Sequence, residues 1–355
     1  LMRRRPPRST LSPSSAASDV YKRQLDINYV PGKILCRDEE IKRLKIAIES
    51  GGRAIICGET GTGKTLLAKY FARDAAYVNC FINRTEHAIL ETILSILKPR
   101  FNPAGLSSRR LWEEIPQNSF IILDEIEGIS ADDLPHFLYT LSRRAETGKR
   151  VKYIAITRDA DILRQVVGDA AVWSTFAGKS IIHLEKYGKE EMVEILNYRA
   201  SEALYDGSFS EDVIGLIADI ALHSEGHMRT GMELLRNSAM IAEGEGRDHI
   251  EPEDVREANM DVWMDEMKIM DEEHLIALLA VSMCCKDRAY ATFDDIKSTY
   301  IRVCENYGSK LGNINGLLEK LEMHGFVMKV DGMYTVPFPT RRIIGKIERS
   351  IEKIR

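Results

Sequence analysis

The sequence lacks three features that would each point to a different class of protein. No apolar stretch approaches the roughly 18 residues needed to span a bilayer, so no membrane partner is expected. The first residues contain no apolar core of the kind that a secretory leader has. The six cysteines form no Cys-x-x-Cys pair and have no histidine cluster beside them, which argues against a zinc site or a disulfide framework. A reducing cytoplasm is the expected location.

The composition is typical of a globular protein with more than one domain. The chain has 355 residues, of which 44% are hydrophobic and 29% are charged, and one hydrophobic core rarely serves a chain of this length. Acidic residues outnumber basic ones overall, whereas residues 286–355 carry 13 basic and 9 acidic side chains. A polyanionic partner is therefore expected mainly at this C-terminal part.

Residues 1–24 differ from the rest of the chain, because they are rich in Arg, Ser and Pro and show no periodicity. They resemble translated adaptor or vector sequence, and we interpret them as a non-native or disordered segment. The alternative is a native basic arm that contacts DNA.

The most specific motif is a complete G-x-x-x-x-G-K-[ST] sequence at residues 58–65. A mostly apolar run at residues 53–57 precedes it and a helical pattern follows, which predicts a strand, a loop and a helix. The glycines allow backbone N–H groups and the helix N-terminus to surround a phosphate. Lys64 is expected to reach the β- and γ-phosphates and Thr65 to ligate Mg²⁺. The alternative is a simple glycine-rich turn, which the Lys-Thr pair disfavours.

A second element of phosphate chemistry follows about sixty residues later. Four apolar residues, 120–123, predict a strand that is buried on both faces of a parallel sheet, and Asp124 and Glu125 come directly after them. Ligands bind at the C-terminal edge of such sheets. Asp124 is therefore expected to hold Mg²⁺ and Glu125 to orient the attacking water. The alternative is a helix N-cap followed by an acidic first turn.

The pattern of apolar residues predicts three domains after the first segment. Residues 25–185 alternate between strand-like runs and amphipathic segments, which predicts an α/β domain with a parallel sheet. Residues 186–265 show helical periodicity and predict a small helical lid. The charged stretch at residues 264–273 is interpreted as a helical linker. Residues 266–355 predict three helices and then a hairpin around Asp331 and Gly332, which indicates a winged helix.

These motifs resemble those of AAA+ ATPases, specifically the archaeal replication initiators related to the large subunit of the origin recognition complex and to its helicase-loading partner. The resemblance runs from about residue 28 to the C-terminus. It includes Tyr-Val-Pro at residues 29–31, Arg-Asp-Glu-Glu-Ile at 37–41, Tyr-Val-Asn-Cys at 77–80 and Ile-His-Leu-Glu-Lys-Tyr at 182–187. It implies an AAA+ base domain, a lid and a winged helix, with ATP or ADP and Mg²⁺ as ligands.

The resemblance also implies residues for the nucleotide site. The expected nucleotide-binding residues are Val30, Pro31, Arg37, Gly58, Glu59, Thr60, Gly61, Thr62, Gly63, Lys64, Thr65, Tyr187 and Arg229. The expected catalytic residues are Lys64, Asp124, Glu125, Arg158 and Arg229, and the expected metal ligands are Thr65 and Asp124.

Three positions bear on hydrolysis in particular. Gly-His-Met-Arg at residues 226–229 resembles the family's second sensor, so Arg229 is expected to reach the γ-phosphate from the lid. Arg158 stands where the family usually has a polar Asn, and it is either a γ-phosphate contact or a surface residue. Ala171 stands where the family has its arginine finger, which predicts slow hydrolysis. Arg164 is a weaker candidate for the same role.

In the winged helix, an apolar stripe on residues 313–323 is expected to pack inward and to leave polar side chains outside. Asparagines can pair with adenine in the major groove and lysines can contact phosphate. The expected DNA-binding residues are Lys310, Asn313, Asn315, Lys320, Lys329, Arg341 and Arg342. The alternative is a polar face on a protein-binding winged helix. The isoleucines at 344, 347, 351 and 354 are expected to seal the domain core or to dock a partner.

The leading interpretation is an ATP-dependent initiator that binds duplex origin DNA and helps to load the replicative minichromosome maintenance helicase, with ATP and ADP as the states of a slow switch. The expected partners are double-stranded DNA, this helicase and further copies of the chain on DNA. The first alternative is a non-catalytic DNA-binding regulator that holds nucleotide as a structural ligand. The second is an AAA+ signalling ATPase whose winged helix binds protein.

Overall fold

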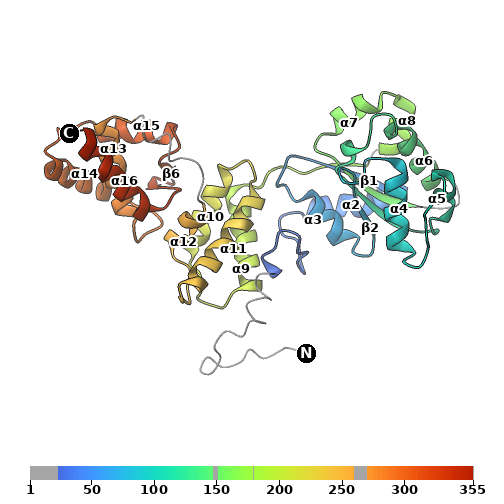
Figure 1. The fold of residues 1–355 in the computed structure, drawn as a ribbon, viewed down its shortest axis with the longest axis horizontal. Coiled ribbons are helices and arrows are strands. Elements are labelled where there is room, and N and C mark those ends of the chain that lie inside the picture. The colour runs from blue at the N-terminus through green and yellow to red at the C-terminus, as the bar shows by residue number, and fades with distance from the viewer. Residues whose placement is uncertain (1–22, 147–150, 179, 260–269, 355) are drawn as a thin grey trace, which may run out of the picture. The chain divides into compact units, whose positions relative to one another are not determined.

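The computed structural model describes residues 23–146, 151–178, 180–259 and 270–354 (Figure 1). Its contacts divide the chain into two units. One unit contains Val30–Glu191 and Glu225–Met228, and the other contains residues 23–29, Met192–Ser224 and the described part of Arg229–Arg355. Residues 1–24, which we interpret as non-native or disordered, lie almost wholly outside the described residues. Most of the predicted linker at 264–273 also lies outside them. The predicted domain boundaries stay predictions.

The first unit is built on a parallel sheet, which confirms the predicted fold class. Its strands are β1 (Arg53–Cys57), β2 (Ala76–Asn79), β3 (Phe120–Asp124), β4 (Lys152–Ile156) and β5 (Ile181–His183). Their order is β2-β3-β4-β1-β5, and each pair of neighbours is parallel. All five strands therefore end at the same edge of the sheet, where the segments that follow them meet.

Helices cover both faces of this sheet. They are α2 (Asp38–Gly51), α3 (Lys64–Phe71), α4 (Glu86–Leu97), α5 (Ser108–Glu114), the 3₁₀ turn η1 (Ile126–Gly128), α6 (Leu134–Glu146), α7 (Ala160–Val167) and α8 (Ala170–Ala177). Because side chains alternate along a strand, Ile55 of β1 packs with the layer of α4 to α8, while Ile56 packs with α2 and α3. This burial on both faces explains the continuous apolar runs in the sequence.

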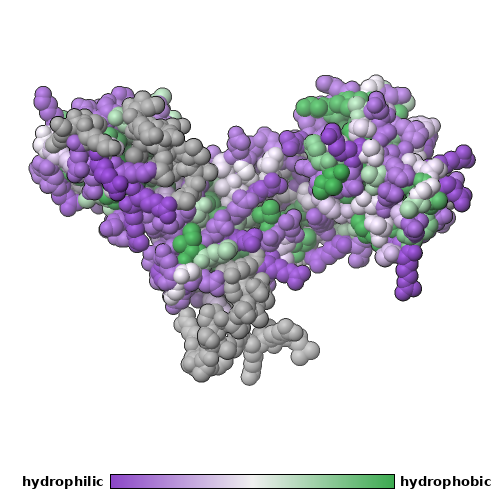
Figure 2. All heavy atoms as spheres, viewed as in Figure 1, coloured by the Kyte–Doolittle hydropathy of each residue, from purple (hydrophilic) through white to green (hydrophobic). Residues whose placement is uncertain are grey.

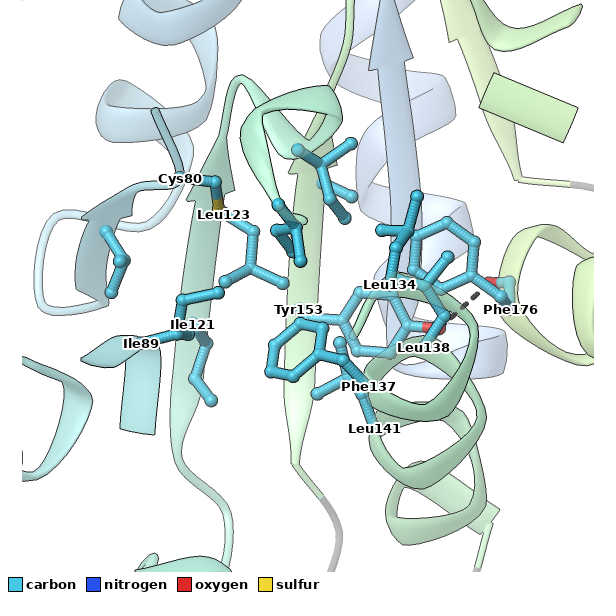
Figure 3. Close-up of a cluster of buried hydrophobic side chains, with 14 of the residues drawn as sticks. Cys80, Ile89, Ile121, Leu123, Leu134, Phe137, Leu138, Leu141, Tyr153 and Phe176 are labelled. Atoms are coloured by element: carbon cyan, nitrogen blue, oxygen red, sulfur yellow. Dashed lines mark hydrogen bonds between the residues drawn. The ribbon is translucent and has the colours of Figure 1, made fainter. Parts of the chain in front are cut away.

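The larger of these two cores contains one buried hydroxyl (Figure 3). Tyr153 of β4 donates a hydrogen bond over 2.8 Å to the carbonyl oxygen of Phe176 in α8. The two rings stack with their centroids 5.6 Å apart. The partner offsets the cost of burying the hydroxyl group, and the contact joins α8 to the centre of the sheet.

The second unit begins with a helical bundle, as the periodicity predicts. Its helices are α9 (Lys189–Ala203), α10 (Glu211–Leu222), α11 (Met228–Gly244) and α12 (Pro252–Ala258). Met192, Leu196 and Ala200 lie four residues apart on α9 and are all buried, because positions at this spacing share one face of a helix.

The C-terminal part has the order of elements of a winged helix. It contains α13 (Glu272–Cys285), α14 (Phe293–Tyr307), α15 (Ile314–Met323), β6 (Met328–Val330), β7 (Met333–Thr335) and α16 (Thr340–Ile354). Strands β6 and β7 are antiparallel, and Ala291 adds a bridge to Tyr334. Asp331 and Gly332 have φ angles of 49° and 80°, which confirms the predicted tight turn, since this turn type needs two positive φ angles.

One detail of the C-terminal helix differs from the prediction. The fully buried side chains are Ile343, Ile347 and Ile351, whereas Ile344 is only partly buried. Ile347 and Ile351 are buried as expected, and Ile343 takes the place expected for Ile344, because residues four apart line one face of α16. The side chain of Ile354 lies outside the described set.

Hydrophobic side chains stand in small groups among hydrophilic ones on the face of the molecule drawn in Figure 2. Among the described helices, none is long and apolar enough to cross a membrane.

Candidate nucleotide-binding site

The predicted phosphate loop joins the end of β1 to the start of α3. Gly58, Gly61 and Gly63 have φ angles of 148°, 81° and 88°. Residues with a Cβ atom rarely adopt such angles. Gly63 is the N-cap of α3, so the unpaired N–H groups of the first turn of α3 lie directly after the loop. A helix N-terminus in this position favours an anion.

Other segments approach the loop so closely that only glycine fits at positions 58 and 61. A Cβ atom on Gly58 would lie 2.4 Å from the carbonyl oxygen of Leu184, and one on Gly61 would lie 2.2 Å from that of Gly226. A Cβ atom on Gly63 would lie 3.2 Å from the hydroxyl of Tyr187. The segment after β5 and residues 225–228 therefore both form walls of the loop.

The side chain of Lys64 folds back over the loop. Its Nζ donates hydrogen bonds to the carbonyl oxygens of Gly58 and Glu59 over 2.6 and 2.7 Å. Burial lowers the pKa of Lys64, the carboxylate of Asp124 opposes this shift, and the nearby cation of Arg158 adds to it. A phosphate at this place would meet the cation of Lys64, and charge-assisted hydrogen bonds of this kind are the strong ones in phosphate recognition.

Thr65 and Asp124 meet as the sequence predicts. The Thr65 hydroxyl donates a hydrogen bond over 2.8 Å to Oδ2 of Asp124, whose side chain is buried. A hydroxyl and a carboxylate this close are the hard oxygen ligands that Mg²⁺ takes together with substrate phosphates. These two residues therefore fit the expected metal.

Tyr77 of β2 is a site residue that the sequence reasoning did not assign a role. Its hydroxyl also donates to Oδ2 of Asp124, again over 2.8 Å. Burial and then the charge of Asp124 raise the pKa of Tyr77, so the hydroxyl keeps its proton and acts as a donor. The Lys69 ammonium lies 3.8 Å from the centroid of the Tyr77 ring. Asp124 is thus held by two hydroxyl groups from two different elements.

Asn79 at the end of β2 is a second unassigned residue, and it holds Glu125. Its Nδ2 donates over 2.8 Å to Oε2 of Glu125. Its Oδ1 accepts the backbone N–H groups of Phe81 and Ile82 at 2.9 and 3.1 Å. These acceptor bonds fix the orientation of the amide, because only the oxygen can accept them. Glu125 itself has a positive φ of 53°, which turns its side chain away from the line of β3.

Arg37 connects the start of α2 to the phosphate loop and to the segment after β5. Its side chain is buried and donates to the carbonyl oxygen of Glu185 over 2.6 Å and to that of Thr62 over 3.4 Å. The guanidinium carbon lies 4.0 Å from the centroid of the Tyr187 ring. Arg37 and Tyr187 thus pack against each other and against the loop. The expected residue Pro31 is buried, and its carbonyl oxygen accepts a hydrogen bond from Arg73.

Comparison with known proteins identifies the family. Residues 54–169 match the ATPase family associated with various cellular activities (AAA), and residues 193–260 match the Cdc6 AAA+ ATPase-type lid domain. The ORC1-type DNA replication protein 1 of Sulfolobus acidocaldarius is 27% identical over 333 residues, which cover 84% of this chain and 83% of the relative. The structure of Cdc6p from Pyrobaculum aerophilum is 25% identical with a TM-score of 0.82, and the match covers 93% of this chain and 98% of that chain.

The chain belongs to the archaeal ORC1/Cdc6 family of AAA+ ATPases. The ORC1-type DNA replication protein 4 of Halobacterium salinarum is 28% identical over 350 residues, or 86% of this chain and 83% of the relative. The structure of Aeropyrum pernix ORC1 in complex with DNA shares the fold at a TM-score of 0.58 and 22% identity, covering 94% of this chain and 96% of that chain.

The structure of this ORC1/Cdc6 chain brings Arg158 to the phosphate loop. Arg158 follows β4, its backbone N–H donates to Glu127, and its carbonyl oxygen accepts from the N–H of Gly58. Ala171 is exposed in the first turn of α8, and Arg164 is exposed on α7. Arg229 stands near the start of α11 in the second unit. The roles of these residues in hydrolysis stay predictions.

The predicted DNA-binding residues of this ORC1/Cdc6 chain fall into two sets. Lys310, Asn313, Asn315 and Lys320 are exposed on or just before α15, and Lys329 is exposed on β6. Arg341 and Arg342 begin α16, where the backbone N–H of Arg341 donates to Glu253 and the Arg342 side chain pairs with Glu257 at 3.6 Å. The start of α16 is therefore engaged by α12. The DNA contacts themselves stay predictions.

Proposed function

We propose that this protein is an ATP-dependent replication initiator that binds duplex origin DNA and helps to load the replicative minichromosome maintenance helicase. The observation that carries the proposal is the complete phosphate-loop site, with Lys64, Thr65, Asp124 and Glu125 at one sheet edge, in the same chain as a lid and a winged helix. The names of the relatives as DNA replication proteins support it.

The proposal gives each domain a task. The base domain, residues 25–185, binds ATP, the lid, residues 186–265, responds to the nucleotide, and the winged helix, residues 266–355, binds DNA. The bound states would then differ in lid angle and so in how the chain holds DNA. Self-association on DNA and a cytoplasmic, nucleoid-associated location go with this proposal.

The residues of the site would divide the hydrolysis reaction among them. Lys64 and the N–H groups of the loop hold and orient the phosphates. Thr65 and Asp124 would hold Mg²⁺, which when bound neutralises charge on the phosphate oxygens. Glu125 would orient the attacking water, and the hydrogen bond that its Oε2 accepts from the Asn79 amide restrains this carboxylate in the described arrangement. Slow turnover follows from this restraint and from Ala171.

The test is binding of the chain, from residue 25 onward, to candidate-origin and random-sequence duplexes with ATP, ADP or no nucleotide across a salt series. We expect selective binding that changes with the nucleotide. Replacing Lys310 and Lys320 with Ala should each reduce the slope of log affinity against log salt by about 1. An absence of DNA binding at low salt, together with tight ATP binding, would favour a signalling ATPase with a protein-binding winged helix.

Two observations favour a second candidate function, a regulator that holds nucleotide without hydrolysing it. The amide of Asn79 donates a hydrogen bond to the carboxylate of Glu125. Ala171 stands where the resemblance places the arginine finger. This candidate predicts tight ATP binding with no turnover. Measurable turnover that Glu125→Gln abolishes would exclude it.

A further inference from the structure

His227, a residue of the Gly-His-Met-Arg motif to which the sequence analysis assigns no role, lies against the phosphate loop. His227 follows Gly226, whose carbonyl oxygen lies so close to Gly61 that no side chain fits there. The Cβ atom of His227 lies 3.2 Å from where a Cβ atom on Gly61 would stand. His227 belongs to the same structural unit as the loop. Its imidazole is therefore carried to the wall of the phosphate site.

The backbone of His227 is held in an uncommon conformation. Its φ angle is 47°, which is the left-handed region. Histidine is among the few non-glycine residues that are enriched there, but the conformation still costs about 1 kcal/mol or more and persists only where the surroundings impose it. Such residues cluster at ligand sites. The position of the ring is thus set by the close approach of residues 225–228 to the loop.

One nitrogen of the His227 ring has no partner. Nδ1 is buried and makes no hydrogen bond to any described residue. Buried polar atoms in native proteins almost always have a partner, and leaving one without it costs about 1–3 kcal/mol. A ligand of the phosphate loop can supply acceptors at this place, since the loop itself is built to hold phosphate oxygens.

Two charged groups act on the ring, Glu59 from the loop and Lys186 from the segment after β5. They pair with each other, with Nζ of Lys186 2.5 Å from Oε2 of Glu59. Burial and then the charge of Lys186 lower the pKa of His227, and Glu59 opposes them. Burial and Lys186 therefore favour the neutral imidazole in the free protein, and its Nδ1 is available to a ligand.

We propose that His227 is a further nucleotide-binding residue, which donates a hydrogen bond from its unpartnered ring nitrogen to a phosphate oxygen of a bound nucleoside triphosphate. This inference rests on the ATP-binding part of the proposed function. The negative charge of the polyphosphate favours the imidazolium, so its arrival raises the pKa of His227. Between the lowered value of the free protein and the raised value of the complex, binding takes up a proton, and affinity rises as pH falls.

Two substitutions distinguish the effect of the imidazole ring from the effect of the backbone conformation at residue 227. His227→Ala removes the donor. His227→Asn keeps a donor and a residue type that tolerates the left-handed conformation, but it cannot take up a proton. His87→Ala is the matched control, because it removes a partly exposed imidazole from α4 in the same unit, where the ring pairs with Glu91. Thermal unfolding without nucleotide checks that each variant is folded.

The measurement is calorimetric titration of the full chain with ATP and Mg²⁺ at about pH 6 and about pH 8, in buffers of different ionisation enthalpy. We expect His227→Ala to bind ATP about tenfold more weakly at about pH 6, as the loss of one hydrogen bond to a charged group implies. Proton uptake should disappear in both His227 variants and persist in His87→Ala.

Two results would overturn the inference. One is wild-type affinity in His227→Ala at both pH values. The other is weaker ATP binding by His227→Ala with unchanged proton uptake. In that case the substitution would act by disturbing the backbone at residue 227, and the imidazole would not be the group that takes up the proton. Failure of the wild-type chain to bind ATP would overturn the proposed function as well. Normal ATP binding without DNA binding would contradict the initiator proposal. The role of His227 would still be decided by the ATP titrations of its variants.

Discussion

Replacing Arg256 with Met is the sharpest test of how the second unit is held together. Arg256 is on α12 and is fully buried. Its guanidinium donates to the carbonyl oxygens of Cys285, Arg288, Ala289 and Val336 over 2.7 to 3.0 Å. Cys285 is the last residue of α13, so the cation lies at a helix C-terminus, where the helix dipole favours positive charge.

Glu253, one turn earlier on α12, has the complementary role. Its carboxylate accepts hydrogen bonds from the hydroxyl of Thr340 and the backbone N–H of Arg341 over 2.8 and 3.1 Å. Both donors are at the start of α16, where the dipole favours negative charge. Glu253 and Arg256 also pair with each other at 3.6 Å. One turn of α12 thus caps two helices of the winged helix.

The magnitude follows from what the substitution leaves behind. Met has a similar length but no donor, so Glu253 would remain buried without its cation and the carbonyl oxygens would lose their partners. Removing one partner of a buried ion pair costs about 3–5 kcal/mol. For a unit of this size each kcal/mol lowers the unfolding temperature by about 2–4 °C, so we expect a fall of about 10 °C.

The assay is differential scanning calorimetry of the full chain. Arg288→Met is the matched control, since the Arg288 side chain is exposed and pairs with Asp295 at 3.6 Å; it should change stability by about 0.5 kcal/mol or less. Adding Glu253→Gln to Arg256→Met should restore part of the loss, because the uncompensated charge is removed while an acceptor remains. An unfolding temperature equal to that of the wild type in Arg256→Met would refute the reasoning.

Three further substitutions test the nucleotide site. Tyr77→Phe should weaken ATP binding several-fold with Mg²⁺ and leave it unchanged with EDTA, as measured by calorimetry; an equal loss in both conditions would point to misfolding instead. Asn79→Ala should raise the rate of ATP hydrolysis at unchanged ATP affinity by releasing Glu125, and a lower rate in a phosphate-release assay would contradict the restraint. Gly61→Ala should weaken ATP binding by at least about tenfold, because the new Cβ atom would collide with the carbonyl oxygen of Gly226 and residue 61 has a positive φ. Wild-type affinity in a nucleotide titration would show that residues 225–228 do not approach the loop this closely.

Much of the fold follows from local patterns. The strand-like runs of residues 25–185 became the strands of the parallel sheet, and the run at residues 120–123 is apolar throughout because helices cover both faces of β3. The predicted turn at Asp331 and Gly332 formed because few other residue pairs accept two positive φ angles. The stripe of α16 was predicted correctly at Ile347 and Ile351 but not at Ile344, since periodicity alone does not say which of two adjacent isoleucines faces the core.

The sequence by itself determined the phosphate loop, the acidic pair after β3 and the family, because these motifs are contiguous and their chemistry needs particular residues at particular spacings. Only the tertiary structure decided which distant side chains complete the site. Tyr77 and Asn79 reach Asp124 and Glu125 because β2 lies beside β3, and no local pattern encodes the order of strands in a sheet. His227 reaches the loop for the same reason, since a contact across more than a hundred residues depends on how the chain packs.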